Sequence, residues 1–203
     1  MDISQFTTNY LNSFRQALDA VDVSVNNKTI SFSEAMIQAV ELIKQAQKLN
    51  KKVMMVGNGG SAGIASHMSV DYWKNGGVRA TAFNDSSLLT CIANDLSYAE
   101  VFSKPIETFA DKGDIVFCIS SSGNSKNILN AAEQAGRSGC TIITFSGFAK
   151  ENPLRKMGNL NFYVPSCSYG FVEIIHNLII HTILDAKLYC VDKKDVFNKN
   201  LPY

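Results

Sequence analysis

Hydrophobic and polar positions follow two different periods along this chain. Apolar residues recur at helical spacing over residues 3 to 23. A second segment with this spacing begins at Ser31 or Ser33, either of which can cap the helix, and ends near residue 50. Five continuous apolar runs then follow, at residues 52–57, 80–84, 114–120, 141–147 and 161–166. Runs of this length are typical of buried strands.

Helical patterns lie between these runs, notably from residue 125 onward, and a long last helix is predicted from about residue 170 to 189. Apolar strands that alternate with helices indicate an α/β fold, in which helices cover both faces of a parallel sheet. No repeat, low-complexity tract or linker interrupts the pattern. We therefore expect a single domain over residues 1–203, with N-terminal helices over about 1–50 and the α/β core and C-terminal helix over 51–193.

The composition excludes several classes of protein. Of the 203 residues, 46% are hydrophobic and 18% are charged, and 19 basic residues against 18 acidic ones leave a formal charge of +1. This balance does not predict a nucleic-acid partner. The sequence has neither a membrane-spanning run nor a signal-peptide pattern. Its five cysteines include no C-x-x-C pair and predict neither a zinc ribbon nor a disulfide framework, so we expect a cytoplasmic protein.

Two loops rich in small and polar residues follow predicted strands. "GNGGSAGIASH" at residues 57–67 follows the first run, and "SSSGNS" at residues 120–125 follows the third. Ligands bind at the carboxyl edge of a parallel sheet, where both loops are expected to lie. Hydroxyl groups, free amides and a helix N-terminus can hold a phosphate without a nearby cation. Because one serine suffices for a helix cap, we interpret four as a phosphate loop: Ser120, Ser121, Ser122 and Ser125.

The first loop taken alone leaves two other interpretations open. Gly57, Gly59 and Ala62 fit the G-x-G-x-x-G/A spacing of a dinucleotide site, and Asp85 follows the second run. A turn of small residues also serves close packing of a helix on a strand. The serine loop is not part of the dinucleotide pattern, and it favours a phosphorylated sugar.

Several motifs together resemble one protein family. They are "GNGGSA" with a following "SH", "IANDLSY", "GDIVFCISSSGNSKNIL" and a last helix that carries Glu and His. Over about residues 5–193 the chain is similar to the phosphosugar isomerase (SIS) superfamily, and within it to the sedoheptulose-7-phosphate (phosphoheptose) isomerases. The resemblance implies a three-layer αβα sandwich around a five-stranded parallel sheet, and a homotetramer with N-terminal helices in its contacts and active sites lined by neighbouring subunits. It also implies substrate contacts at the four serines and at Asn58, Gly59, Gly60, Asn94 and Asp95.

Histidines and carboxylates recur at helical spacing in two segments. His67 and Asp71 share one helix face, and Glu173 and His181 share a face of the last helix. Taken singly, these are also the marks of a surface pair and of a satisfied core histidine. The resemblance implies instead that all four can bind zinc, that Asp71 is the catalytic base and His181 the acid, and that Glu173 contacts substrate. The family carries Glu at position 71 and Gln at position 173. His176, about 140° around the helix from His181, is assigned to packing or an interface.

The activity implied by the resemblance is aldose–ketose isomerisation of a phosphorylated sugar, foremost sedoheptulose 7-phosphate, through an enediol. Two alternatives stay open. One is a non-catalytic SIS protein that binds a sugar phosphate or another protein. The other is an isomerase of a different phosphosugar, since pocket chemistry rather than fold sets the substrate. The carboxylate at position 71 together with His181 favours an enzyme.

Overall fold

The computed structural model describes residues 2–26 and 28–197. Its strands are β1 (Asp22–Val25), β2 (Lys28–Ile30), β3 (Lys52–Gly57), β4 (Arg79–Ala82), β5 (Ile115–Ser120), β6 (Thr141–Ser146) and β7 (Leu160–Tyr163). Its α-helices are α1 (Ile3–Asp19), α2 (Phe32–Lys48), α3 (Gly60–Lys74), α4 (Ser86–Asp95), α5 (Ser103–Phe109), α6 (Lys126–Arg137) and α7 (Tyr169–Cys190). Two short 3₁₀ helices are η1 (Tyr98–Glu100) and η2 (Leu154–Lys156).

The strands form one mostly parallel sheet in the order β2-β1-β7-β6-β5-β3-β4. The five predicted strands are confirmed as β3 to β7, and each runs parallel to its neighbours among the five. β3 lies directly beside β5, and Gly57 at the end of β3 pairs with Ile119. This pairing brings the glycine loop after β3 and the serine loop after β5 to the same edge of the sheet.

A β-hairpin at one edge of the sheet corrects the expectation of five strands and of a first helix that reaches residue 23. α1 ends at Asp19, and β1 then pairs antiparallel with both β7 and β2, which makes the sheet seven-stranded. Asn26, after β1, has a φ of 48°, a left-handed conformation that asparagine adopts more readily than most residues. Val23 is almost fully buried because β1 closes the sheet over the hydrophobic core.

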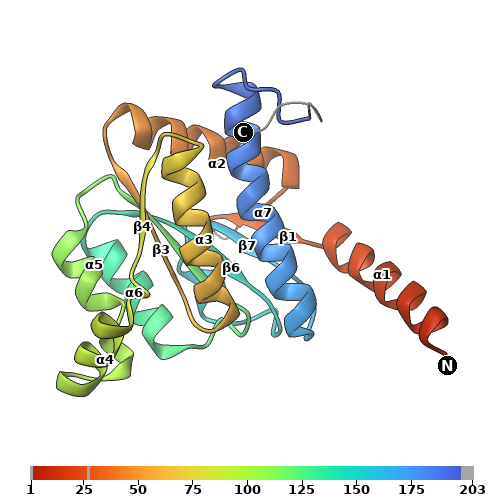
Figure 1. The fold of residues 1–203 in the computed structure, drawn as a ribbon, viewed down its shortest axis with the longest axis horizontal. Helices are drawn as coiled ribbons and strands as arrows, with labels where there is room; N and C mark the ends of the chain where they lie inside the picture. Colours follow the sequence, from red (N-terminus) through yellow and green to blue (C-terminus); the bar gives the residue numbers. More distant parts are fainter. Residues whose placement is uncertain (1, 27, 198–203) are drawn as a thin grey trace.

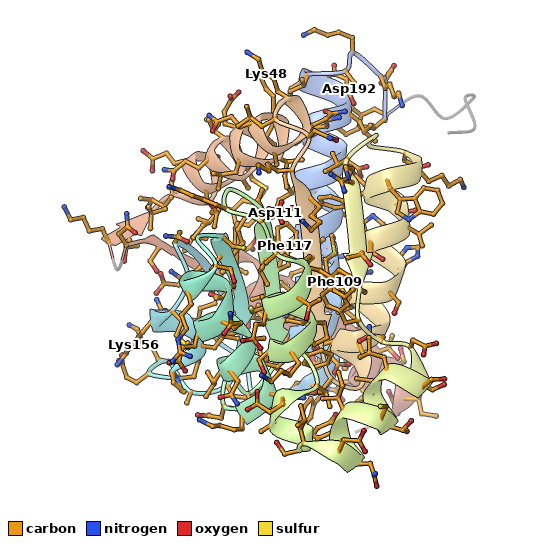
Figure 2. All side chains as sticks on the ribbon, turned by 90° about the vertical axis from the view of Figure 1, so that its left-hand side faces the viewer. Lys48, Phe109, Asp111, Phe117, Lys156 and Asp192 are labelled. Carbon is orange, nitrogen blue, oxygen red and sulfur yellow. The ribbon has the colours of Figure 1, made fainter. Side chains whose placement is uncertain are left out.

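Helices cover both faces of the sheet, as Figures 1 and 2 show. α2, α3 and α7 pack on one face, and α5 and α6, flanked by α4, pack on the other. Alternate residues of β3 enter the two cores: Val53 and Met55 pack with the first group of helices, and Met54 and Val56 with the second. The predicted three-layer α/β architecture is therefore confirmed.

The two N-terminal helices differ in how they are held. α2 begins at a capping box, in which the Ser31 hydroxyl accepts the Glu34 backbone N–H and the Glu34 carboxylate accepts the Ser31 N–H. α1 reaches away from the sheet (Figure 1) and contacts α7 through Tyr10 and Phe14, whose rings pack on Phe171. Among the helices of the described part of the chain, none has the length and apolar character to cross a membrane.

Candidate active site

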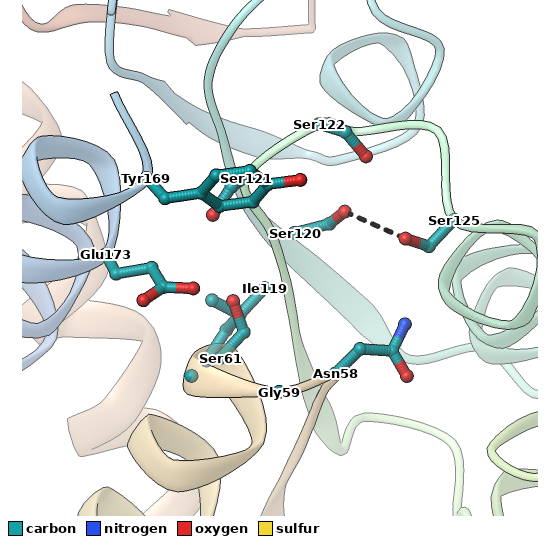
Figure 3. A pocket seen from close by; sticks show the side chains of 11 residues that line it. Asn58, Gly59, Ser61, Ile119, Ser120, Ser121, Ser122, Ser125, Tyr169 and Glu173 are labelled. Atoms are coloured by element: carbon teal, nitrogen blue, oxygen red, sulfur yellow. Dashed lines mark hydrogen bonds between the residues drawn. The ribbon is translucent and has the colours of Figure 1, made fainter. Parts of the chain in front are cut away.

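A pocket of about 230 Å³ lies at the carboxyl edge of the sheet, between the loops that follow β3 and β5 (Figure 3). The residues predicted for the site that line it are Asn58, Gly59, Gly60, Ser120, Ser121, Ser122, Ser125 and Glu173. Ser61, Ile119 and Tyr169 also line it, and the sequence did not single them out. Ser61 stood within the quoted "GNGGS" motif, whereas nothing local marked Tyr169, the first residue of α7.

The glycines after β3 permit a tight strand-to-helix turn and a close approach of α7. A Cβ on Gly57 would lie 2.5 Å from the backbone oxygen of Ser61, and a Cβ on Gly60 would collide with the Glu173 carboxylate. Gly59, the N-cap of α3, has a φ of 54°, which favours glycine. Close packing therefore accounts for Gly57 and Gly60, while the turn accounts for Gly59.

The serine loop leaves hydrogen-bonding groups available to a ligand. Ser120 Oγ accepts the backbone N–H of Gly123 at 3.2 Å, whereas the buried Ser121 hydroxyl finds no partner within residues 2–26 and 28–197. Ser125, the N-cap of α6, makes no side-chain capping bond in the described part of the chain, and Gly59, the N-cap of α3, has no side chain with which to make one. Two helix N-termini and a free hydroxyl thus border the pocket, an arrangement that attracts an anion.

The charges around the pocket indicate where such an anion can lie. No lysine or arginine is among the described residues that line it, and Glu173 adds a carboxylate. Figure 3 shows Glu173 and Tyr169 on one side of the pocket and Ser125 and Asn58 on the opposite side. Because like charges repel, an anionic group is held best at the serine side, away from Glu173.

A second cluster of chemically active side chains joins the middle of α3 to α7. His67 Nε2 lies 3.4 Å from Asp71 Oδ2, and the rings of His67 and His181 are 5.4 Å apart. One ligand atom from each of His67, Asp71 and His181 lies within 4.8 Å of the others. The structure thus brings together three of the four residues predicted as metal ligands, although 114 positions (181 minus 67) separate the two histidines.

The fourth predicted ligand, Glu173, is not part of this cluster. Eight residues of helix separate it from His181, about 12 Å along the axis, and its carboxylate lies against Gly60 in the pocket. Asp185, one turn beyond His181, is the carboxylate that the sequence analysis missed. Burial raises the pKa of its carboxyl group, the nearby His181 acts in the opposite direction, and Asp71 adds to the rise.

The predicted sugar contacts Asn94 and Asp95 lie at the end of α4, outside the residues that line the pocket. The carboxylate of Asp95 accepts hydrogen bonds from Asn94 Nδ2 and Cys91 Sγ, and these bonds lower its pKa. The nearby Tyr98, by contrast, does reach the site, since its hydroxyl donates to Asn58 Oδ1 at 3.0 Å.

His176 packs inside the fold, which is the first of the two predicted roles, packing or an interface. It is fully buried, and its Nε2 lies 3.1 Å from the carbonyl oxygen of Ser146. Because that carbonyl can only accept, Nε2 carries the proton and Nδ1 does not. Burial lowers the pKa of His176 to about 4.

Comparisons with known proteins agree with this architecture. Residues 9–147 match the SIS domain family. The phosphoheptose isomerase of Coxiella burnetii is 34% identical over 195 residues, covering 91% of this chain and 96% of its own.

Two solved structures share the whole fold. The phosphoheptose isomerase of Neisseria gonorrhoeae superposes with a TM-score of 0.80 at 27% identity, over 92% of this chain and 99% of that one. The enzyme from Francisella tularensis gives 0.80 at 25% identity, over 96% and 100%. With a family match over most of its length and a relative above 30% identity, this chain belongs to the SIS domain family and, within it, to the phosphoheptose isomerases.

Proposed function

We propose that this chain is an enzyme that isomerises sedoheptulose 7-phosphate to an aldoheptose 7-phosphate. The observation that carries the proposal is the arrangement of two sites along α3 and α7, an anion pocket at the N-terminal ends of both helices and an acid–base cluster farther along them. A sugar phosphate has its phosphate at one end of the carbon chain and its reacting carbonyl at the other. Two separate sites match that chemistry.

In the proposed reaction, Asp71 and His181 move protons between two neighbouring carbons and their oxygens. The Asp71 carboxylate takes a proton from C1 of the ketose while His181 gives a proton to the carbonyl oxygen at C2, which forms an enediol. Asp71 then returns its proton to C2, and the hydroxyl at C1 gives its proton back to His181 as the aldehyde forms. Both residues end as they began.

Zinc fits the donor set of the cluster. Two imidazoles and one carboxylate from His67, Asp71 and His181 match the ligands of catalytic zinc sites, which keep a further position open. When bound there, zinc would polarise the oxygens at the reacting end of the sugar, and Asp71 or His181 would have to leave it in order to act as base or acid. Glu173, in the pocket, is then free to contact the substrate.

The alternatives are a non-catalytic sugar-phosphate or protein-binding module and an isomerase for another phosphosugar. A purely binding protein has no need of a carboxylate and two imidazoles gathered on two helices that also line the pocket, and the family membership likewise supports an enzyme. The serine loop, which lines the same pocket as the glycine loop, also favours a sugar phosphate over a dinucleotide.

The proposal includes assembly as a homotetramer in the cytoplasm. Exposed apolar side chains on α1, among them Ile3, Phe6 and Leu11, support burial against another copy. All five cysteines are free, which supports a reducing compartment.

The decisive experiment incubates the purified protein in deuterated water with a panel of ketose and aldose phosphates and follows them by NMR. We expect sedoheptulose 7-phosphate to be converted and deuterium to enter the carbon next to the carbonyl, because an enediol exchanges that proton. Tight binding of one sugar phosphate without conversion of any would favour the binding module. Conversion of another sugar alone would correct the substrate.

A further inference from the structure

The two loops of the pocket are joined by a pair of asparagines. Asn58, in the glycine loop, donates from Nδ2 to Asn127 Oδ1 at 2.9 Å, and Asn127 donates from Nδ2 to Asn58 Oδ1 at 2.9 Å. Asn127 is the second residue of α6, two positions after Ser125, and it is 2% exposed. It does not line the pocket, so its amide is occupied with Asn58 and not with a ligand.

Tyr98 adds a third hydrogen bond to this asparagine pair. Its hydroxyl donates to Asn58 Oδ1 at 3.0 Å, so this oxygen accepts two hydrogen bonds, one for each lone pair. Nδ2 has two hydrogens, of which one goes to Asn127. Asn58 therefore has no acceptor capacity left on its side chain and retains one N–H donor.

That donor lies on the side of the phosphate loop. Figure 3 shows the amide nitrogen of Asn58 turned toward Ser125 and the oxygen turned away. Asn58 lines the pocket together with the four serines. The amide nitrogen thus lies in the half of the pocket that suits an anion, where it can donate to an oxygen of a ligand, while a donor group of a ligand finds no free acceptor on this side chain.

We propose that Asn127 and Tyr98 are positioning residues, which hold the Asn58 amide so that it presents a single N–H donor to a phosphate oxygen of the substrate. The inference rests on the proposed function, because it takes the ligand to be a sugar phosphate. It adds a specificity element, since the amide selects an acceptor at this point of the pocket. It also couples the two loops, because the Asn58 N–H of the glycine loop is held in place only while Asn127 of α6 is bonded to it.

The test compares two asparagines of the same helix. Asn127→Leu keeps the branched shape and the heavy-atom count of the side chain, and it removes both hydrogen bonds to Asn58. The matched control is Asn130→Leu, since Asn130 Nδ2 donates to Ala99 O and Glu100 Oε1, both at 3.1 Å, and does not contact Asn58. The measurements are the Kd of inorganic phosphate and of sedoheptulose 7-phosphate by calorimetry, kcat and KM, and the Tm.

We expect Asn127→Leu to raise Kd and KM about tenfold or more, with a much smaller change in kcat, because a mispositioned donor affects a charged oxygen at the non-reacting end. Asn130→Leu is expected to lower the Tm while Kd and KM stay within about twofold. Tyr98→Phe, which alters an exposed side chain, is expected to raise Kd by a smaller factor than Asn127→Leu.

Different results separate this inference from the proposed function. If the wild-type protein binds and converts the sugar but Asn127→Leu and Tyr98→Phe leave Kd and KM as in Asn130→Leu, the positioning role is wrong and the proposed function stands. If the wild-type protein neither binds nor converts any sugar phosphate, both fall together.

Discussion

At the scale of single residues, Asp71 is the sharpest departure from the family pattern. The resemblance to the phosphoheptose isomerases implies Glu at this position. Its carboxylate is 3.4 Å from His67 Nε2 and accepts from Asn75 Nδ2 at 3.2 Å. We expect Asp71→Asn to keep phosphate binding and the fold but to lower kcat by about 10²- to 10⁴-fold, because the amide cannot take up a proton. Steady-state kinetics on sedoheptulose 7-phosphate, with calorimetry as the control for binding, measures both.

Asp71→Glu tests whether the pocket has been adapted to the shorter side chain. If the substrate is that of the family, the longer side chain should retain or raise turnover. If the pocket is built around Asp for another sugar, turnover should fall. Unchanged turnover in Asp71→Asn would remove Asp71 as the base, and the carboxylates of Glu173 and Asp185 would become the candidates.

At the scale of elements, the serine loop depends on a glycine that any other residue would replace only with strain. Gly123 has a φ of 63°, and a Cβ there would collide with the side chain of Asn152. The buried Asn152 is itself held by hydrogen bonds from its Nδ2 to Ser146 Oγ and to two backbone carbonyl oxygens of the β6–β7 connection. The loop after β6 therefore supports the shape of the loop after β5.

We expect Gly123→Ala to destabilise the protein by about 1–3 kcal/mol, from the strained backbone alone, and to weaken binding of inorganic phosphate at least tenfold. The control is Gly63→Ala on the exposed side of α3, where a Cβ meets nothing within 4 Å. There alanine should stabilise by about 1 kcal/mol, since glycine is the poorer helix former. Chemical denaturation and calorimetry report the two effects, and unchanged phosphate affinity in Gly123→Ala would contradict the assigned loop.

At the scale of the whole molecule, α1 is a helix with large apolar side chains exposed. Phe6 is 55% exposed on a helix that reaches away from the sheet (Figure 1). If this face is buried between copies, Phe6→Glu should shift the protein from a tetramer to smaller species in light scattering after size-exclusion chromatography, because a buried unpaired charge is costly. Asn12→Glu, about 120° around α1 from Phe6, is the control, and its assembly should be unchanged. Equal behaviour of the two variants would exclude α1 from the interface.

Global stability should depend on pH through His176. Its folded pKa of about 4 lies below the ordinary 6.5, so between these values the unfolded chain binds a proton that the folded protein does not. The unfolding free energy is thus fully retained above pH 6.5 and falls as the pH drops toward 4, by up to about 1.4 kcal/mol per pH unit and about 3 kcal/mol in all. The amide of His176→Gln can still donate to Ser146 O but does not titrate. In this variant the slope of unfolding free energy against pH between 4 and 6.5, measured by denaturation, should be shallower by up to about 1.4 kcal/mol per pH unit. Equal slopes would contradict it.

The sequence by itself determined the parallel core and the location of the pocket. Both sides of β3, β5 and β6 are buried, so each strand is a continuous apolar run that can be recognised without knowing which strands pair with it. The capping box of α2 is equally local. The loops after β3 and β5 could be assigned to one edge because parallel strands end there.

The tertiary structure decided which side chains meet. The hairpin of β1 and β2 forms because β1 pairs with β7 from the far end of the chain, which no local period reveals. His67 and His181 come together because α3 and α7 pack side by side on the sheet, and the same packing leaves Glu173 at the pocket instead of in their cluster. Asn58 and Asn127 pair because β3 lies next to β5. Periodicity and caps depend on residues a few positions apart, whereas these contacts depend on strand order and helix packing, which only the folded chain specifies.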